Sequence, residues 1–258
     1  MEEKISEGME RFLKTGLTRE DNKDVVRRML AGGASQGSRA GGEGRAREDE
    51  ATMRYDDAFR KTERRLSEAQ ERIQRERQLA AVQWAGLEGH PPARRLVMVR
   101  NDARLHHWGL FDLLVDKSRA LAEADAAAAV QLAELALAVA ERLDEGVYGE
   151  ERVCDFRTAA LATLGDARRL AGDFAGARLA YSQARINLEM GTGDLLEEAG
   201  LLGGLVNLLC DLGEYEKAAR SLERATSLYR RLGDDHLVGV ELPRAEEEKR
   251  GQRHGAAG

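Results

Sequence analysis

Residues 172 to 225 carry the same spaced set of side chains twice. The first set is Gly172, Phe174, Ala177, Tyr181 and Ala184, and the second is Gly213, Tyr215, Ala218, Leu222 and Ala225. Gly213 follows Gly172 by 41 residues, and the other pairs have the same offset. Repeats of about 20 to 50 residues are typical of solenoids, in which each unit stacks on its neighbours. The sequence therefore predicts a stack of repeated units.

The residue types in the repeat indicate how each unit folds. A glycine ends the first helix, and the aromatic residue after it begins the second. Alanines seven residues apart let the two helices approach closely and let the next unit pack on them. Gly165 extends the first set toward the N-terminus, where the second set has Val206. Each unit is therefore predicted to be a hairpin of two helices.

A further hairpin is expected on each side of these two. Before them lie a first helix with Trp108, Phe111, Leu114 and Val115, and a second over 126–143 with Val130, Leu132, Leu135, Val139 and Leu143. After Leu232, a last hairpin begins with Leu237, Val238, Val240 and Leu242, but Pro243 ends it. The array is therefore predicted to span residues 103–242, followed by a disordered tail over 243–258.

The segments LATLGDARRLAGDFAGARLAYSQA and LVNLLCDLGEYEKAARSLERA resemble the tetratricopeptide repeat family in their glycine, aromatic and alanine positions. Their step is longer than the usual step of about 34 residues, and Val206 replaces the glycine. The resemblance implies a concave surface lined by the first helix of each pair, which binds a protein or peptide. It places four polar residues in that groove: Asp166, Arg169, Asn207 and Asp211.

Residues 1–102 are organised differently. Residues 1–31 are expected to form a small helical hairpin, and residues 32–49 a flexible linker rich in Gly, Ser and Arg. Residues 50–102 are predicted to hold a long charged helix, about 50–88, and a short helix after His90-Pro-Pro. The long helix has an apolar seam in steps of four and three: Tyr55, Phe59, Thr62, Leu66, Ala69 and Ile73. It is either an exposed helix held by ion pairs or a two-helix or dimer contact.

The order of these parts resembles a group of bacterial proteins that join an anti-sigma-type zinc finger to tetratricopeptide repeats. The segments that carry the resemblance are MERFLKTGLTRED, VVRRMLAGG, HPPARRLVMVRND and WGLFDLL. The positions of the family's metal ligands are taken here by residues such as Lys4, Arg28, Gly33 and Gln36. Because zinc needs thiolate or imidazole donors, no metal is expected in this segment.

Composition agrees with an all-helical chain. The sequence has 258 residues with only three prolines, 5% aromatic residues and 33% charged residues, and its net charge is −6. The expected fold is an all-α, short α-solenoid of tetratricopeptide-like hairpins, preceded by a long charged helix and a small N-terminal helical hairpin. No apolar run approaches the roughly 20 residues that cross a bilayer, so a cytoplasmic location without a membrane partner is expected.

The sequence offers no catalytic site. It lacks a phosphate loop, a dinucleotide fingerprint and an HExxH pair. His106 and His107 are adjacent, so on a helix they cannot share a metal, and Cys154 and Cys210 are expected to be inert apolar thiols. The arginines of the linker have no interleaved aromatic residues for stacking on bases. No cofactor, metal or nucleic acid is therefore expected.

Three functions remain open on the sequence. The first is a non-catalytic adaptor or scaffold that binds a protein or peptide through its repeats. The second is an anti-sigma-like transcription regulator that acts through the N-terminal hairpin without zinc. The third is a structural protein that forms homo-oligomers through the seam of the long helix or the unfinished last repeat.

Overall fold

The computed structural model describes the backbone of residues 43–232, with side chains from residue 67 onward and those of Arg60, Lys61 and Arg64. The expected N-terminal hairpin, most of the linker, the last hairpin and the tail lie outside the described residues. The same holds for the side chains of four seam residues, Tyr55, Phe59, Thr62 and Leu66. The chain divides into two compact units, Met1–Arg65 and Leu66–Gly258, and helix α3 runs through the boundary between them.

All regular structure among residues 43–232 is helical, as predicted. The order is α3 (Glu43–Glu88), α4 (Pro92–Asn101), the short 3₁₀ helix η1 (Ala103–Leu105), α5 (Trp108–Leu121), α6 (Ala126–Ala140), α7 (Glu145–Tyr148), α8 (Glu150–Leu170), α9 (Phe174–Glu189), α10 (Leu195–Asp211) and α11 (Tyr215–Arg231). None of the helices in the described region is both long and apolar enough to cross a membrane.

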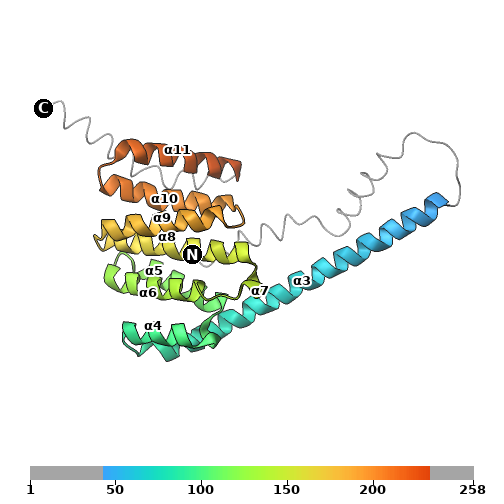
Figure 1. Ribbon diagram of the computed structural model, residues 1–258, viewed down its shortest axis with the longest axis horizontal. Helices are drawn as coiled ribbons and strands as arrows, with labels where there is room; N and C mark the ends of the chain where they lie inside the picture. The colour runs from blue at the N-terminus through green and yellow to red at the C-terminus, as the bar shows by residue number, and fades with distance from the viewer. Residues whose placement is uncertain (1–42, 233–258) are drawn as a thin grey trace. The chain divides into compact units, whose positions relative to one another are not determined.

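The second unit is a stack of antiparallel helix pairs. Helix α5 packs on α6, α8 on α9 and α10 on α11, and α6 and α9 connect each pair to the next (Figure 1). The all-α solenoid predicted from the repeat is therefore the observed architecture. The first members of the pairs are α5, α8 and α10, and the second members are α6, α9 and α11.

The two repeats begin and end their helices in the same way. Gly172 and Gly213 have φ angles of 79° and 71°, which only glycine adopts without strain. The residue after each glycine donates its N–H to a carbonyl of the preceding helix, Asp173 to Arg168 at 2.9 Å and Glu214 to Leu209 at 2.8 Å. The aromatic residue that follows is the first residue of α9 or α11.

Aspartate side chains fix the starts of several helices. Asp125, Asp173 and Asp194 each accept a hydrogen bond from a free N–H in the first turn of α6, α9 and α10. His107 does the same for α5, because its Nδ1 accepts from Leu110 N at 3.3 Å while its Nε2 hydrogen-bonds to Gln83 Oε1 at 2.6 Å. Burial lowers the pKa of His107, which favours this neutral, hydrogen-bonding form.

The main hydrophobic core also includes residues that precede residue 103, where the array was expected to begin. Ala80, Trp84 and Leu87 of α3 and Val99 of α4 are buried in one cluster with α5, α6 and the start of α8. The predicted boundary at 102/103 therefore does not separate two folding units. The reason is that α3 and α4 form a hairpin of their own, whose apolar face covers the N-terminal end of the stack.

The expected linker also ends earlier than predicted. Helix α3 begins at Glu43, so residues 43–49 are helical rather than linker. This stretch contains Arg45, Ala46, Arg47 and Glu48, which are strong helix formers despite the nearby glycines. The C-terminal end of the long helix, Glu88, is where the sequence placed it.

One glycine lets α3 and α5 touch backbone to backbone. A Cβ atom at Gly109 would lie 2.8 Å from Arg77 N and closer still to the carbonyl group of Glu76. The Glu76 side chain is buried beside it and accepts hydrogen bonds from Gly109 N at 3.2 Å and from the Tyr148 hydroxyl at 2.8 Å. This contact therefore joins α3, α5 and α7.

We predict that Gly109→Ala destabilises the protein by about 2–3 kcal/mol, because α3 must move away from α5. The measurement is the free energy of unfolding in urea, followed by circular dichroism. The matched control is Gly86→Ala in α3, where a Cβ meets nothing within 4 Å. That variant should gain about 0.5–1 kcal/mol from helix propensity. Equal effects of the two substitutions would contradict the close contact.

Candidate functional site

The first helices of the three pairs present a common face, here called the first-helix face. Its polar residues are Asp112, Asp116 and Arg119 on α5; Arg152, Asp166 and Arg169 on α8; and Glu197, Asn207 and Asp211 on α10. On α10, residues 197, 207 and 211 fall on one side at 3.6 residues per turn. The four residues placed in a groove by the family resemblance all belong to this face.

Two of those four residues bind each other across neighbouring repeats. Arg169 Nη1 donates to Asp211 Oδ2 at 2.7 Å, which joins α8 to α10. The Arg169 side chain is only 9% exposed, and its Nε has no hydrogen-bond partner among the described residues. Because the Arg169 guanidinium is largely removed from water, whereas Asp211 is exposed, loss of Asp211 would leave a nearly buried positive charge without its partner. Arg169 and Asp211 therefore hold the stack together.

Asp166 is bonded within the array in a similar way. The Tyr181 hydroxyl donates to Asp166 Oδ1 at 2.6 Å, which links α9 back to α8. Burial raises the pKa of Asp166, and the Tyr181 hydrogen bond and the charges of Arg169 and Arg119 oppose that rise. Burial and the adjacent carboxylate also raise the pKa of Tyr181, so the phenol keeps its proton and remains a donor.

The Tyr181 ring lies between two glycines of different helices. A Cβ at Gly165 of α8 would lie 2.9 Å from the ring, and one at Gly204 of α10 would lie 2.7 Å from the hydroxyl. The sequence identified Gly165 and Tyr181 as repeat positions, but it did not identify Gly204. The signal that could have found it is the Gly203-Gly204 pair in the middle of an otherwise leucine-rich helix.

We predict that Tyr181→Phe costs about 1–3 kcal/mol of stability, because the substitution leaves the Asp166 carboxylate without its donor. Thermal and urea unfolding measure the loss. Tyr215→Phe is the control, since the half-buried Tyr215 hydroxyl forms no hydrogen bond with another described residue. A loss for Tyr181→Phe no larger than that for Tyr215→Phe would show that the hydrogen bond is unimportant.

The pKa values of two other carboxylates on the first-helix face are also raised. Burial and Asp194 raise the pKa of Glu197, while the positive charges of Arg119 and Arg152 oppose the rise. Burial and Asp116 raise the pKa of Asp112 to about 6, although Arg77 lies 3.7 Å away and lowers it. Arg119 is exposed on α5, yet its charge acts on carboxylates of both α8 and α10. Arg119 therefore offsets part of the effect of burial on the pKa values of Asp166 and Glu197.

Asp112 gives a pH-dependent prediction. Its pKa rises from 3.8 to about 6 on folding, so the folded protein holds this proton more tightly than the unfolded chain. The tighter binding of this proton therefore stabilises the folded protein fully below about pH 4, and this stabilisation is lost as the pH rises to about 6. After allowance for solvent screening, Asp112→Asn should stabilise the protein by about 1 kcal/mol at pH 7 and have little effect at pH 3.5. Unfolding of both proteins across this range measures the difference, and a constant difference would contradict the prediction.

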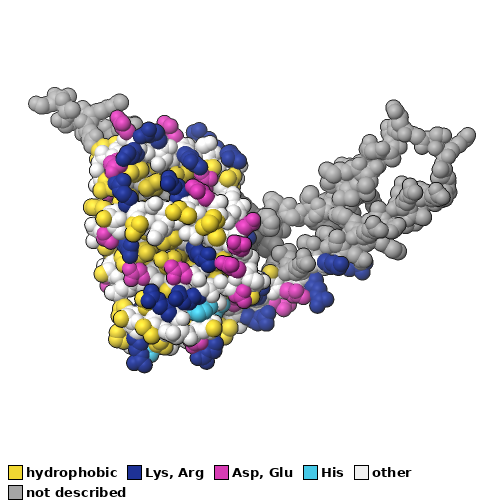
Figure 2. Space-filling model, viewed as in Figure 1, with side chains coloured by type: hydrophobic (Ala, Val, Ile, Leu, Met, Phe, Trp, Pro, Cys, Tyr) yellow, Lys and Arg dark blue, Asp and Glu magenta, His cyan; other side chains and the backbone are white. Residues whose placement is uncertain are grey.

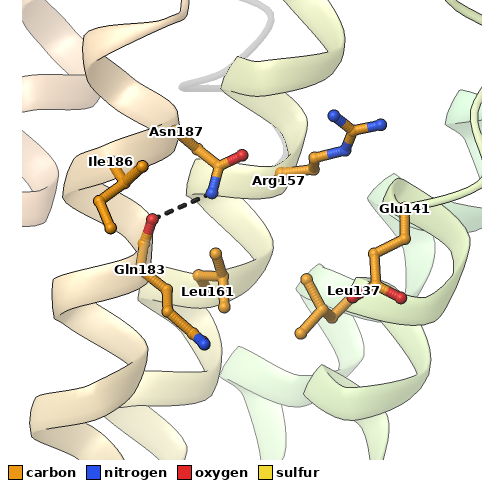
Figure 3. A pocket seen from close by; sticks show the side chains of 7 residues that line it. All are labelled: Leu137, Glu141, Arg157, Leu161, Gln183, Ile186 and Asn187. Atoms are coloured by element: carbon orange, nitrogen blue, oxygen red, sulfur yellow. Dashed lines mark hydrogen bonds between the residues drawn. The ribbon is translucent and has the colours of Figure 1, made fainter.

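A pocket lies on the other side of α8. It has a volume of about 320 Å³, and Leu137, Glu141, Arg157, Leu161, Gln183, Ile186 and Asn187 line it. Residues of α9 and α6 form its two walls, with α8 between them (Figure 3). Leu161 and Asp166 are five residues apart, so on α8 they point about 140° away from each other. The sequence did not predict this pocket.

Both charged and amide side chains lie at the rim of the pocket. Arg157 Nη2 donates to Glu145 Oε1 at 3.2 Å, and Asn187 Nδ2 donates to the Gln183 carbonyl at 3.0 Å. On the face of the second unit seen in Figure 2, basic and acidic side chains alternate with hydrophobic ones. No charge of one sign therefore dominates the pocket or the face in view.

Within residues 67–232, no group of three or more His, Cys, Asp or Glu side chains is arranged to hold a metal ion. Cys154 is buried and Cys210 is half-buried, and neither forms a disulfide bond within the described region. His106 and His107 are each bonded inside the fold, His106 through Nε2 to the Val99 carbonyl at 2.6 Å.

Comparison with protein-family models, with curated proteins and with solved structures finds no match. The assignment of the described helices to a solenoid therefore rests on their geometry. The resemblances to tetratricopeptide repeats and to anti-sigma zinc-finger proteins stay predictions from the sequence.

Proposed function

We propose that this chain is a non-catalytic interaction module that binds a protein or peptide through the first-helix face of its stacked hairpins. The observation that carries the proposal is the set of polar residues that the first helix of each of the three hairpins contributes to one face, among them the exposed Asp116 and Arg119 of α5 and the half-buried Asn207 of α10. A surface to which successive repeats each contribute a first helix fits an extended ligand better than a small one.

The half-buried carboxylates support a binding role for this face. A carboxylate with a raised pKa is partly desolvated and incompletely paired, which costs folding free energy. Such groups occur both in structural ion-pair networks and at functional sites. Asp166 serves the structure through Tyr181, but Asp112 and Glu197 have no comparably short hydrogen bond in the described region. A donor or cation on a partner would satisfy them.

Some residues of the first-helix face are bonded inside the stack and others are not, and this difference determines which residues to mutate. Asp166, Arg169 and Asp211 are bonded inside the stack, so their substitution disturbs packing as well as binding. Arg119 and Asp116 are exposed, and Asn207 is half-buried without a hydrogen bond to another described residue. These three side chains are therefore free to contact a partner.

We expect a triple variant, Arg119→Glu, Asp116→Lys and Asn207→Ala, to lose the partners that the wild-type protein captures from its native lysate. The reason is that charge and hydrogen-bonding groups change on the binding face, while none of the three substituted residues belongs to a buried apolar cluster. The readout is quantitative mass spectrometry of captured proteins. The control is Arg220→Glu with Glu223→Lys, two exposed residues of α11. An unchanged set of partners in the triple variant would refute the assignment of this face.

The anti-sigma alternative concerns residues outside the described part of the chain. Removal of residues 1–42 separates it from the repeat hypothesis without altering α3–α11. A repeat-based module keeps its partners after this deletion, whereas a regulator that acts through the N-terminal hairpin loses a sigma factor.

A further inference from the structure

His107 lies where α3, η1 and α5 meet, and both nitrogens of its imidazole ring form hydrogen bonds. Nδ1 accepts from the backbone N–H of Leu110 at 3.3 Å, which caps the start of α5. Nε2 lies 2.6 Å from Oε1 of Gln83, a residue of α3. The Gln83 amide in turn donates to the backbone carbonyl of Arg104 in η1 at 2.9 Å. One half-buried ring therefore links three elements.

The two ends of this chain of hydrogen bonds determine where the ring carries its proton. A backbone N–H can only donate, and a backbone carbonyl can only accept. Because the N–H of Leu110 donates to Nδ1, that nitrogen carries no proton. Because the amide nitrogen of Gln83 donates to Arg104, its Oε1 faces His107 and accepts from Nε2. The bonds therefore require a neutral ring with its proton on Nε2.

A second proton on His107 would break this arrangement. It would occupy Nδ1, so that two N–H groups would face each other at the start of α5. The new positive charge would also lie at the N-terminus of α5, where the helix dipole favours negative charge. The ring relieves both by turning, but its bond to Gln83 depends on the same orientation. Loss of the cap therefore also weakens the link between α5 and α3.

Glu76 of α3 is the carboxylate whose charge favours a protonated His107. Its two oxygens already accept hydrogen bonds, from Gly109 N at 3.2 Å and from the Tyr148 hydroxyl at 2.8 Å. Burial has the larger effect and lowers the pKa of His107 below its ordinary value of 6.5. The surroundings therefore favour the neutral ring that the hydrogen bonds require.

The other charged groups of the neighbouring elements are engaged elsewhere. Arg104 of η1 binds Asp102 at 2.7 Å, and Arg72 of α3 lies 4.0 Å from Glu76. His106, the adjacent residue, hydrogen-bonds through Nε2 to a backbone carbonyl of α4. These described neighbours thus offer no unused carboxylate that could stabilise a charged imidazole.

We propose that His107 is a pH-sensitive joint between α3 and α5, closed while its ring is neutral and opened when the ring gains a second proton. The closed joint stabilises the fold fully above about pH 6.5, the ordinary pKa of histidine. This stabilisation is lost as the pH falls through the lower pKa of the folded protein. The joint is independent of the proposed function, because it concerns how α5 is held and not what the first-helix face binds.

Unfolding of the full-length protein between about pH 7.5 and about pH 4.5 tests the joint, with His107→Asn as the comparison. Asparagine is also a preferred N-cap, but its side chain does not titrate. The ratio of the unfolding constants, wild type to variant, should rise about fivefold on acidification, which is the typical worth of an N-cap. Titrations elsewhere, such as that of Asp112, affect both proteins and cancel from the ratio. A constant ratio would overturn the proposal.

The matched control is His106→Asn, at the neighbouring histidine. His106 donates from Nε2 to the Val99 carbonyl at 2.6 Å, a bond that the neutral and the charged ring can both form. The ratio of unfolding constants for this variant should therefore not rise as the pH falls. An equal rise for the two variants would show that the cap on α5 is not the cause, which would also overturn the proposal.

A measurement on the wild type does not depend on how the variants fold. In ¹⁵N-labelled full-length protein, the NMR chemical shifts of the ring nitrogens should show His107 neutral and protonated on Nε2 at about pH 7.5. The amide resonance of Leu110 should move together with this ring as the pH is lowered. A neutral ring protonated on Nδ1, or a Leu110 amide that does not follow the titration, would contradict the joint.

Discussion

The stack depends on a few glycine positions, at which one helix has no side chain and a neighbouring helix fills the space. At Gly109 the backbone of α5 meets the backbone of α3. At Gly165 and Gly204 two helices close on the ring and the hydroxyl of Tyr181. Interiors are packed as densely as organic crystals, so even one methyl group at such a contact must move a whole helix. These positions set the distances between hairpins, and the apolar clusters fill what remains.

Each close contact also has a buried polar group that must be satisfied. Glu76 accepts hydrogen bonds at the contact of α3 with α5, and Asp166 accepts one at the contact around Tyr181. An unsatisfied carboxylate in these places would cost more than the bond itself contributes. The helices therefore meet in one register, in which glycine and hydrogen-bond donor coincide. The long helix α3 supports the N-terminal end of the array in this way, through its final turns.

The two outer surfaces of α8 have different properties. On the first-helix face, charged groups of three hairpins lie close enough to shift each other's pKa values. On the side of α6 and α9, a pocket and exposed apolar residues adjoin. The two surfaces of this short array therefore differ in the chemistry that they expose to solvent.

The repeat of Gly172 and Phe174 by Gly213 and Tyr215 determined the solenoid from sequence alone, because helix ends and small packing positions are local signals with a fixed period. In contrast, the hydrogen-bonding and ion-pair partners of individual polar residues lie far from them in the sequence. Arg169 and Asp211 are 42 residues apart in the chain, and only stacking joins them. Tertiary structure likewise made α3 and α4 part of the core and placed Gly204 against Tyr181, since contacts between helices depend on crossing geometry that no periodicity encodes. The sequence thus determined the kind of unit and its repetition, whereas the stack decided which polar groups hold it together and which remain free to bind.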